Sequence, residues 1–393
     1  MVKVIAMYFP QFHAIPENNR WWGEGFTDWV NVKKAKPQFE GHYQPRVPLN
    51  HHYYDQSDLK TIRWQTDLAQ EYGLYGFCHY HYWFEEKRLL HKPTDLLLCN
   101  KDIKFPFCLS WANETWSRQW DGQNHRILIR QTHIPEKTRW KKHFDYLIKA
   151  WTDERAIKVD GRPIFAIYRP QNIEHLDDML DFWQEEARRY GLNQGIYFIA
   201  QKQYEFHDKS ILRRFDAVFQ FNPFESIFYK KEAQKTPETQ LRKKLKAMVP
   251  APLRLCLRSL LNKLSPKLIF HNYDDVWADL VQMRTEPGIT TFPGAFVDWD
   301  NTPRYNNRAT LFKGCCPERF EYWLGQLIDT MGQRNLPADY IFLNAWNEWG
   351  ESAYLEPDEK NGYRYLEAVK RAVNRPLAGK RLKNNSLEKE HNV

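Results

Sequence analysis

Hydrophobic residues in this chain gather into short runs of strand length, and each run is followed by a cluster of polar and aromatic residues. The last run, YIFL at residues 340–343, contains no charged side chain, which is typical of a strand buried on both faces. Between several runs the apolar residues recur at helical spacing, at residues 59–72, 175–190 and 318–331, and Gly73 and Gly191 end the first two segments. The predicted strands are residues 4–9, 75–82, 105–109, 163–168, 196–200, 217–221, 295–297 and 340–343.

The alternation of eight predicted strands with helical segments indicates an α/β fold, the (β/α)8 barrel of TIM type. In that fold the carboxyl ends of all strands share one face, so the polar clusters would meet there. A doubly wound sheet would usually carry a glycine-rich turn after its first strand, and none follows residues 4–9. We expect one catalytic domain over residues 1–374, with an insertion at about residues 226–287 between strands six and seven, and a disordered tail at residues 375–393.

Charge is spread unevenly along the chain. The formal net charge is +8, but residues 230–267 hold eleven Lys or Arg against two Glu, which leaves the rest of the chain at −1. An enzyme that acts on nucleic acid is expected to have a basic surface around its site, so we expect no nucleic acid partner.

The insertion contains a basic amphipathic stretch at residues 253–264, in which five leucines share one helical face with Arg254, Arg258 and Lys263 among them. Two alternatives are open. One is peripheral contact with an anionic membrane surface through about residues 241–264. The other is docking of the leucines on the barrel or on a second subunit, and a stripe at helical spacing favours this second alternative.

The amino-terminal sequence MVKVIAMYFPQFH carries no charged leader and no long apolar core, and no apolar run in the chain has the length needed to cross a bilayer. The six cysteines show no paired spacing. We therefore expect a cytoplasmic protein with reduced thiols.

The strongest candidate for chemistry is the stretch IFLNAWNEWGESAYLEPD at residues 341–358. Glu348 and Glu351 lie three residues apart between Trp346 and Trp349, directly after a predicted buried strand. Cleavage of a glycosidic bond needs one carboxyl group at the leaving oxygen, a second as base or nucleophile, and aromatic faces that hold a sugar. The alternative is a turn with exposed acids and core tryptophans, but the flanking Asn and Trp residues favour a site. We interpret the two glutamates as catalytic.

Clusters at other strand ends add candidates for sugar binding. His79 and His81 alternate along one predicted strand and so point the same way, but no third ligand is spaced to complete a metal site, and we expect neither a metal ion nor another cofactor. For the cluster at residues 111–116 the alternative is that Trp111 is a core residue and that Glu114 forms an ion pair with Arg118.

Asp298 and Asp300 share one side of their strand end and, with Arg304, are expected to bind hydroxyl groups or to be structural. The aromatic content of 16% fits a site that stacks on sugar rings. The expected substrate-binding residues are Tyr8, Gln11, His13, Trp22, Glu24, His79, His81, Trp111, Asn113, Glu114, Trp116, Asp298, Trp299, Asp300, Asn344, Trp346, Asn347 and Trp349.

Five motifs occur together: FPQFHAIPENNRWWGEGFTDWVNV, YGFCHYHYWF, LSWANETWSRQWDG, FVDWDNTPR and NAWNEWGESAYLEP. The set resembles the WbsX-type family of sugar-active proteins, often labelled glycosyltransferases of lipopolysaccharide O-antigen synthesis. That family is similar to glycoside hydrolase family 99, the endo-α-mannosidases. The resemblance covers residues 4 to about 372 and is weak in the basic insertion.

The resemblance implies a (β/α)8 barrel that acts with retention and needs no metal ion to break the bond. It implies that Glu351 is the general acid and base at the glycosidic oxygen. It also implies that Glu348 deprotonates the sugar 2-hydroxyl, whose oxygen attacks the anomeric carbon to give an anhydrosugar. Gly350 stands where family 99 hydrolases tend to carry His, so the geometry beside the acid is expected to differ.

The resulting hypothesis is a hydrolase-like enzyme that acts on an oligosaccharide with α-linked, mannose- or rhamnose-like sugars, in cell-surface polysaccharide or O-antigen metabolism. A glycosyltransferase in which an acceptor hydroxyl replaces water would use the same two carboxylates. A non-catalytic carbohydrate-binding barrel is the third hypothesis.

Overall fold

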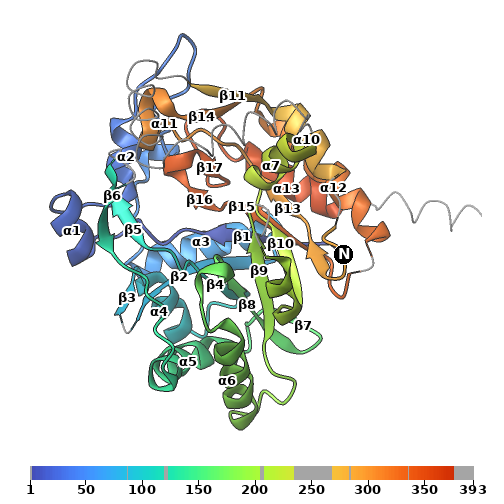
Figure 1. The fold of residues 1–393 in the computed structure, drawn as a ribbon. Helices are drawn as coiled ribbons and strands as arrows, with labels where there is room; N and C mark the ends of the chain where they lie inside the picture. The colour runs from blue at the N-terminus through green and yellow to red at the C-terminus, as the bar shows by residue number, and fades with distance from the viewer. Residues whose placement is uncertain are drawn as a thin grey trace, which may run out of the picture.

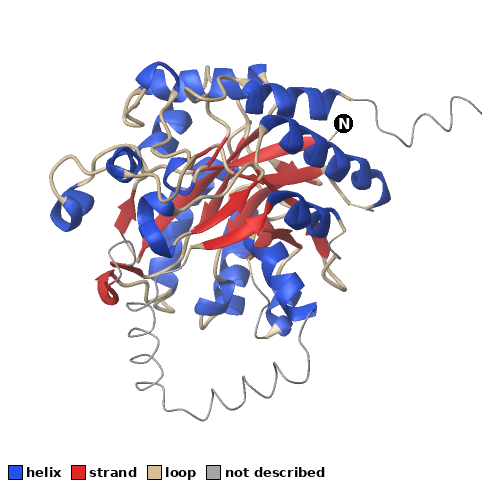
Figure 2. Ribbon diagram, turned by 90° about the horizontal axis from the view of Figure 1, so that it is seen from above, coloured by secondary structure: helices blue, strands red, loops and turns tan. Residues whose placement is uncertain are grey.

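The computed structural model describes residues 2–85, 87–118, 123–203, 208–233, 268–282, 285–334 and 336–375. Parallel strands form the centre, and helices surround them on the outside (Figures 1 and 2). The order of neighbouring strands is β12, β10, β9, β8, β4, β2, β1, β15 and β13. These strands are β1 (Lys3–Tyr8), β2 (Gly76–Phe84), β4 (Phe107–Trp111), β8 (Arg162–Ile167), β9 (Tyr197–Lys202), β10 (Ala217–Gln220), β12 (Thr290–Phe292), β13 (Gly294–Phe296) and β15 (Tyr340–Asn344).

The two ends of this strand order belong to one interrupted strand, and this closes the barrel. β12 pairs with β10, β13 pairs with β15, and only Pro293 separates β12 from β13. Gly294 is required at this seam, because an added Cβ would lie 1.6 Å from the backbone oxygen of Gln220. The described chain therefore forms eight parallel strand positions, and each predicted strand overlaps one of them. The predicted (β/α)8 barrel is confirmed.

Helices cover the outside of the barrel, and the three predicted helical segments correspond to α3, α6 and α12. Their inward faces join one large buried cluster with the outward-facing residues of the strands. The helices are α3 (Leu59–Glu71), α4 (Lys92–Cys99), α5 (Lys137–Trp151), α6 (Leu176–Arg189), α7 (Phe224–Ala233), α10 (Tyr273–Val281), α12 (Pro317–Thr330) and α13 (Arg364–Asn374), with α1 (Pro16–Trp22), α2 (Asp28–Lys34) and α11 (Thr302–Tyr305) in the loops.

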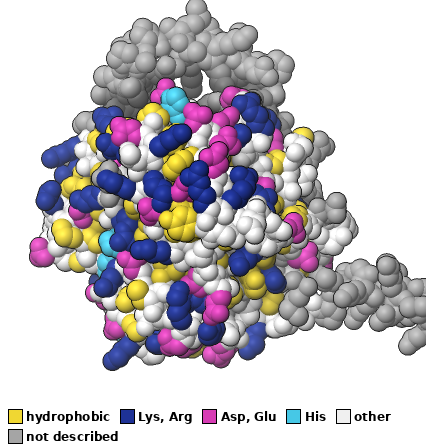
Figure 3. All heavy atoms as spheres, turned by 90° about the horizontal axis from the view of Figure 1, so that it is seen from below, with side chains coloured by type: hydrophobic (Ala, Val, Ile, Leu, Met, Phe, Trp, Pro, Cys, Tyr) yellow, Lys and Arg dark blue, Asp and Glu magenta, His cyan; other side chains and the backbone are white. Residues whose placement is uncertain are grey.

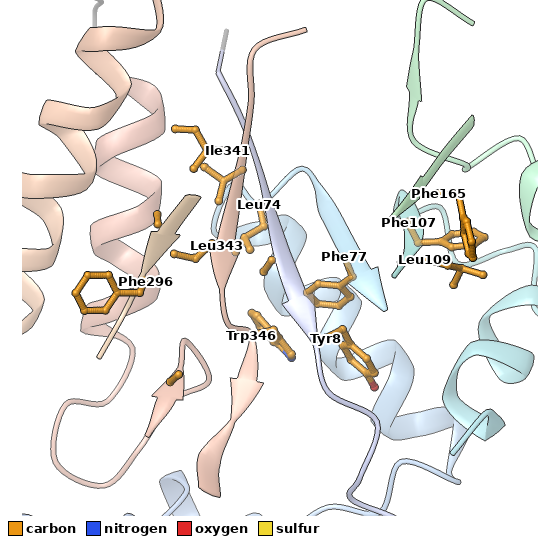
Figure 4. Packing of buried hydrophobic residues seen from close by; sticks show 14 of the residues in the cluster. Tyr8, Leu74, Phe77, Phe107, Leu109, Phe165, Phe296, Ile341, Leu343 and Trp346 are labelled. Atoms are coloured by element: carbon orange, nitrogen blue, oxygen red, sulfur yellow. The ribbon is translucent and has the colours of Figure 1, made fainter. Parts of the chain in front are cut away.

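Alternate residues of each strand face opposite sides of the barrel wall. In β2, Cys78, Tyr80 and Tyr82 belong to the cluster inside the barrel, whereas Phe77 packs in the layer between strands and helices. Figure 4 shows that outer layer, where the ring of Phe77 lies 5.2 Å from Tyr8 and 5.1 Å from Trp346 between ring centroids. This alternation decides which residues near the strand ends can reach a site on the barrel axis.

Two helices within or beside the expected insertion are part of the layer around the barrel. Ile227 of α7 and the residues Tyr273, Trp277 and Leu280 of α10 are buried in the outer cluster. The Tyr273 hydroxyl also donates to the backbone oxygen of Val297 at 2.8 Å. Residues 253–264, with the membrane-contact hypothesis for residues 241–264, lie outside the described residues, as does the tail from residue 376.

Within the described residues, no helix combines the length and the apolar character that crossing a membrane requires. On the face drawn in Figure 3, Lys and Arg side chains are mixed with Asp and Glu side chains. This mixture agrees with the near-neutral charge calculated for the chain outside residues 230–267.

We predict that Trp277→Ala lowers the free energy of unfolding by about 3–5 kcal/mol, because it removes a fully buried indole from the layer between α10 and the barrel. Urea unfolding followed by fluorescence measures the change. The control is Tyr322→Ala on α12, where the side chain is 56% exposed and the expected change is within about 0.5 kcal/mol. Equal effects of the two substitutions would show that α10 is not part of the barrel layer.

Candidate active site

A polar cavity of about 420 Å³ lies at the carboxyl ends of the barrel strands, and Glu348 and Glu351 line it. All eight strand positions contribute to it, directly or through the residues that follow them. A smaller cavity of about 160 Å³ adjoins it and shares the lining residues Phe9, Tyr82, Glu114 and Trp116. The other residues that line the main cavity are Tyr80, Ala112, Tyr168, Arg169, Gln203, Phe221, Phe224, Trp299, Asn301 and Tyr305.

The two glutamates lie on a short hairpin that is fixed to the end of β1. The side chain of Asn347 accepts a hydrogen bond from the backbone N–H of Phe9 at 2.8 Å and donates one to the Phe9 oxygen at 3.0 Å. The backbone N–H of Trp346 donates to the Met7 oxygen at 2.8 Å. β16 (Asn347–Glu348) then pairs in an antiparallel manner with β17 (Ala353–Tyr354). The position of Glu348 is therefore set by backbone contacts on both sides.

The tryptophans that flank the glutamates are core residues. Trp346 is fully buried and packs on Phe77 (Figure 4). Trp349 is also fully buried, stacks on Tyr354 with 3.7 Å between ring centroids, and donates its indole N–H to Glu356 at 2.7 Å. Neither tryptophan lines the cavity that the glutamates face. Their packing holds the hairpin, and other aromatic residues form the cavity wall.

One guanidinium group joins both glutamates to a third carboxylate. Arg304 of α11 places Nη1 2.6 Å from Glu351 Oε1 and 3.4 Å from Glu348 Oε1. Its Nη2 lies 2.9 Å from Oδ2 of Asp28, which is fully buried at the start of α2 and also accepts a hydrogen bond from Asn31. Figure 1 shows α2, α11 and the β16–β17 hairpin gathered on one side of the barrel.

The electrostatics of this cluster favour a shared proton. Burial raises the pKa of Glu348 to about 8, and the charges of Glu351 and Asp28 add to the rise while Arg304 opposes it. Burial also raises the pKa of Glu351, against the lowering effect of Arg304. Because the guanidinium is closer to Glu351, it stabilises the ionised form of that glutamate more strongly. The raised pKa of Glu348 therefore favours its protonated form near neutral pH, while the guanidinium favours the ionised form of Glu351, and acid–base catalysis requires such a pair.

The absence of a side chain at residue 350 is a packing requirement of this cluster. A Cβ at Gly350 would lie 2.3 Å from Asp28 Oδ2 and 2.9 Å from Arg304 Nε. The Asp28–Arg304 pair thus occupies the space that a side chain at residue 350 would need.

The model of the glycosyltransferase WbsX family matches residues 4–369. The chain belongs to the WbsX glycosyltransferase family. This confirms the resemblance found in the five sequence motifs and identifies the chain as a member of a carbohydrate-active enzyme family.

Curated relatives of this WbsX-family chain include the uncharacterized protein WxcX of Xanthomonas campestris pv. campestris, in strains B100 and ATCC 33913. Each is 34% identical over 377 residues, which is 95% of this chain and 50% of the relative. The chain therefore spans about half the length of the curated relatives it matches.

Solved structures with a similar fold include an endo-α-mannosidase of glycoside hydrolase family 99 from Bacteroides thetaiotaomicron, with a TM-score of 0.54 and 12% identity over 98% of both chains. A glycoside hydrolase-like protein has a TM-score of 0.53 and 13% identity over 95% of this chain and 94% of the other. At these identities the likeness shows a shared fold.

Five of the expected substrate-binding residues line the two cavities. Glu114, Trp116 and Trp299 line the main cavity, and Gln11 and Trp22 line the adjoining one, which Trp116 and Glu114 also border. The cationic partner of Glu114 is Arg169, at 2.6 Å, and not the Arg118 considered from the sequence.

Four expected residues face the helices and not the cavity, because they occupy outward positions of their strands. Tyr8 donates its hydroxyl to Gln65 at 2.6 Å and stacks on His79. The Nε2 atom of His81 lies 2.8 Å from Nε2 of His143, and Trp111 also packs on the helix side of its strand.

Asn113, Asn344 and Asn347 are buried and bond to backbone groups of other loops. Asn113 accepts from the N–H of Arg169 at 2.7 Å and donates to its oxygen at 2.9 Å, and Asn344 donates to the Asn222 oxygen at 3.1 Å. These three side chains fix the loops around the cavity but do not line it.

Asp298 and Asp300 point away from the main cavity and line a separate one, together with their partners Arg46 and His42. His13 lines neither the main nor the adjoining cavity, and burial lowers its pKa to about 4. Glu24 is exposed and accepts a hydrogen bond from Asn19 at 2.8 Å.

Tyr80, Tyr82, Arg169 and Asp28 are site residues that the sequence analysis missed. Tyr80 and Tyr82 are the inward-facing neighbours of the two histidines chosen from the same strand. One signal was available. Cys78 lies on the same face of the strand as Tyr80 and Tyr82, and a small apolar residue of this kind is suited to the inside of a barrel. No local signal marks Asp28, because its partner Arg304 is 276 residues away in the chain.

We predict that Glu348→Gln changes the pH dependence of stability. Burial raises the pKa of Glu348 from its ordinary value of 4.5 to about 8 in the folded protein, so between these two pH values the folded state holds an extra proton. The free energy of unfolding of the wild type therefore falls as pH rises through this window, and a glutamine removes that fall. Between about pH 5 and about pH 8.5, the free energy of unfolding of the variant should rise by on the order of 1–3 kcal/mol relative to that of the wild type.

Urea unfolding at several pH values measures this difference. The control is Glu40→Gln, a substitution at an exposed side chain, whose curve should run parallel to that of the wild type. A Glu348→Gln curve parallel to the wild type would contradict a protonated Glu348.

We predict that Gly350→Ala lowers the free energy of unfolding by about 1–3 kcal/mol, because the new methyl group must displace Asp28 or Arg304. Thermal unfolding monitored by circular dichroism measures the change. Gly332→Ala is the matched control, because a Cβ at that residue meets no atom within 4 Å. If the two variants lose the same stability, the cluster is not close-packed around Gly350.

Proposed function

We propose that this chain is a retaining, family 99-like enzyme that acts on α-linked sugars of the mannose or rhamnose type in cell-surface polysaccharide or O-antigen metabolism. The observation that carries the proposal is the buried pair Glu348 and Glu351, joined by Arg304 at the wall of a cavity lined by aromatic and amide side chains. The family match and the fold shared with an endo-α-mannosidase support the class of substrate.

In the proposed first step Glu351 gives its proton to the glycosidic oxygen while the bond from that oxygen to the anomeric carbon breaks. Glu348 accepts the proton of the 2-hydroxyl, and the 2-oxygen forms the new bond to the anomeric carbon. In the second step the oxygen of a water or acceptor hydroxyl attacks the same carbon and its proton passes to Glu351. The bond from that carbon to the 2-oxygen breaks, and Glu348 returns its proton to the 2-oxygen. Two displacements at one carbon retain its configuration.

This division of roles places a requirement on substrate binding. Without a sugar, the closer approach of Arg304 to Glu351 and the raised pKa of Glu348 favour the proton on Glu348. The proposed roles need the proton on Glu351 when the glycosidic bond breaks. Binding of the 2-hydroxyl beside Glu348 supplies the change, because a carboxylate that accepts a hydrogen bond is favoured in its ionised form.

The cavity offers groups that recognise sugars in two ways. Tyr80, Tyr82, Trp116 and Trp299 present aromatic rings, which pack on the C–H faces of a sugar ring. The amides of Gln203 and Asn301 supply hydrogen-bond donors and acceptors for sugar hydroxyls.

The description of the family as glycosyltransferases favours a second candidate, a transferase that passes the sugar to an acceptor hydroxyl. The same carboxylates would perform it, because the acceptor replaces water in the second step. A non-catalytic sugar-binding barrel is the remaining alternative.

We predict that Glu351→Gln and Glu348→Gln respond differently to the leaving group. With an oligosaccharide, Glu351→Gln should lower kcat/KM by about 10²–10⁴, since general acid catalysis is lost. With the α-glycosyl fluoride of the same sugar, whose fluoride leaves without a proton, the loss should be less than about tenfold. Glu348→Gln should lose activity on both substrates. Fluoride release and product chromatography measure the rates.

Glu40→Gln is the control for preparation and folding, and nuclear magnetic resonance of the first-formed product tests retention. Product without a nucleotide-sugar donor supports the hydrolase, and product only in the presence of a donor supports the transferase. Sugar binding without turnover of any substrate would support the non-catalytic binding barrel. If Glu348→Gln and not Glu351→Gln kept its activity on the fluoride, the proposed roles of the two glutamates would be exchanged.

A further inference from the structure

A second large cavity, of about 440 Å³, lies on the other side of the segment that follows β13. It is bounded by the loop around residues 39–46, by β11 (Ile269–Asn272) and β14 (Thr310–Lys313), and by the start of α12. Trp299 faces the main cavity, and its neighbours Asp298 and Asp300 face this one. The two cavities thus share a wall but have different linings.

The two carboxylates of this wall are bonded to buried side chains. Asp298 lies 2.8 Å from Arg46 Nη2. Asp300 accepts hydrogen bonds from His42 at 2.8 Å and from Gln44 at 2.7 Å. These contacts occupy both acids, and the charge of Arg46 opposes their negative charge.

The cavity has additional positive charge that no described carboxylate neutralises. Lys313 and Lys360 both line it and are exposed, and within the described residues neither forms an ion pair with an Asp or Glu. Arg364 lines it too, and is paired with Glu318. Lysine ammonium groups at the mouth of a cavity attract anions and donate up to three hydrogen bonds each.

Aromatic rings stand beside these ammonium groups at the rim. Phe39 and Phe270 are each 40% exposed, and their ring centroids are 5.5 Å apart. Lys313 Nζ lies 4.2 Å from the centroid of the Phe270 ring, and Lys360 Nζ lies 4.7 Å from that of Tyr43. Exposed phenyl rings at a cavity rim offer a flat apolar surface on which a ring of a ligand can stack.

We propose that this cavity, which we name the basic cavity, binds a phosphate-bearing small molecule, with Lys313 and Lys360 on the phosphate and the phenyl rings on the attached ring system. Nucleoside diphosphates and sugar phosphates both have this chemistry. The cavity has the size of small-molecule sites, which are typically about 300–1,000 Å³. The proposal does not depend on the roles of Glu348 and Glu351, because neither glutamate lines the basic cavity.

Isothermal titration calorimetry of the full chain with UDP, GDP, mannose 1-phosphate and mannose tests the proposal. We expect at least one phosphate-bearing probe to bind, and mannose not to compete with it. Lys313→Ala and Lys360→Ala should each weaken binding by about tenfold or more, because each removes a charged hydrogen-bond donor. The matched control is Lys370→Ala. Lys370 lies on α13, and its ammonium group stands over the ring of Tyr72, so its removal should leave the affinity unchanged.

The variants also distinguish the source of the phosphate. If UDP or GDP binds more tightly than mannose 1-phosphate, and Phe270→Ala removes the difference, the ligand is a nucleotide. If mannose 1-phosphate binds more tightly, the ligand is a sugar phosphate. The proposal is overturned if none of the three phosphate probes binds. It is also overturned if a probe binds and neither Lys313→Ala nor Lys360→Ala changes its affinity, because the probe would then lie in another cavity.

Discussion

The candidate active site of this barrel depends on one buried interaction, the contact of Arg304 with Asp28, Glu348 and Glu351. A single cation cannot neutralise three carboxylates in a region from which water is largely excluded, so the cluster is favoured with a proton on one of the glutamates. The pKa of Glu348 is raised first by its burial and then by the charges of Glu351 and Asp28. The same contact joins three separate segments, α2, α11 and the loop after β15, around one cavity.

This dependence explains features that otherwise look unrelated. Gly350 leaves room for Asp28 and Arg304, so the glycine is part of the cluster although it has no functional group. Asn347 fastens the hairpin to Phe9 and keeps Glu348 at the end of β1. Buried Glu356, whose pKa burial raises to about 7, accepts hydrogen bonds from Trp349 and Tyr54 beneath the hairpin. The proposed catalytic carboxylates are held by buried polar contacts.

The fold could be predicted from the sequence because the barrel strands are buried on both faces. Such strands appear in the sequence as short apolar runs. Gly73 and Gly191 mark the carboxyl ends of two of the helices between strands. The same burial on both faces made the site harder to predict. In β2, aromatic and histidine residues alternate, so composition alone does not show whether Tyr80 or His81 faces the axis.

The choice between the two faces needed the register of β2 against its neighbours. In the strand register, Cys78 lies opposite Met7 of β1 and Cys108 of β4, and these small or flexible residues fill the barrel interior. Once Cys78 is inside, Tyr80 and Tyr82 must also be inside, and the histidines must face the helices. The position of Glu348 and Glu351 at the cavity could be predicted without this information because they lie beyond the strand, where a tight hairpin and not strand alternation sets the direction of side chains.

The segment after β13 shows how the same alternation serves two cavities. Trp299 faces the proposed sugar site, while Asp298 and Asp300 turn to the basic cavity and are satisfied there by Arg46, His42 and Gln44. The backbone N–H of Asp300 also donates to the backbone oxygen of Glu351 at 2.8 Å, so the segment that holds these acids is joined to the loop that carries Glu351. Part of the positive charge of the basic cavity is therefore committed to the geometry of the candidate active site. Only the exposed ammonium groups at its rim are left for a ligand, and for this reason they decide whether the cavity binds one.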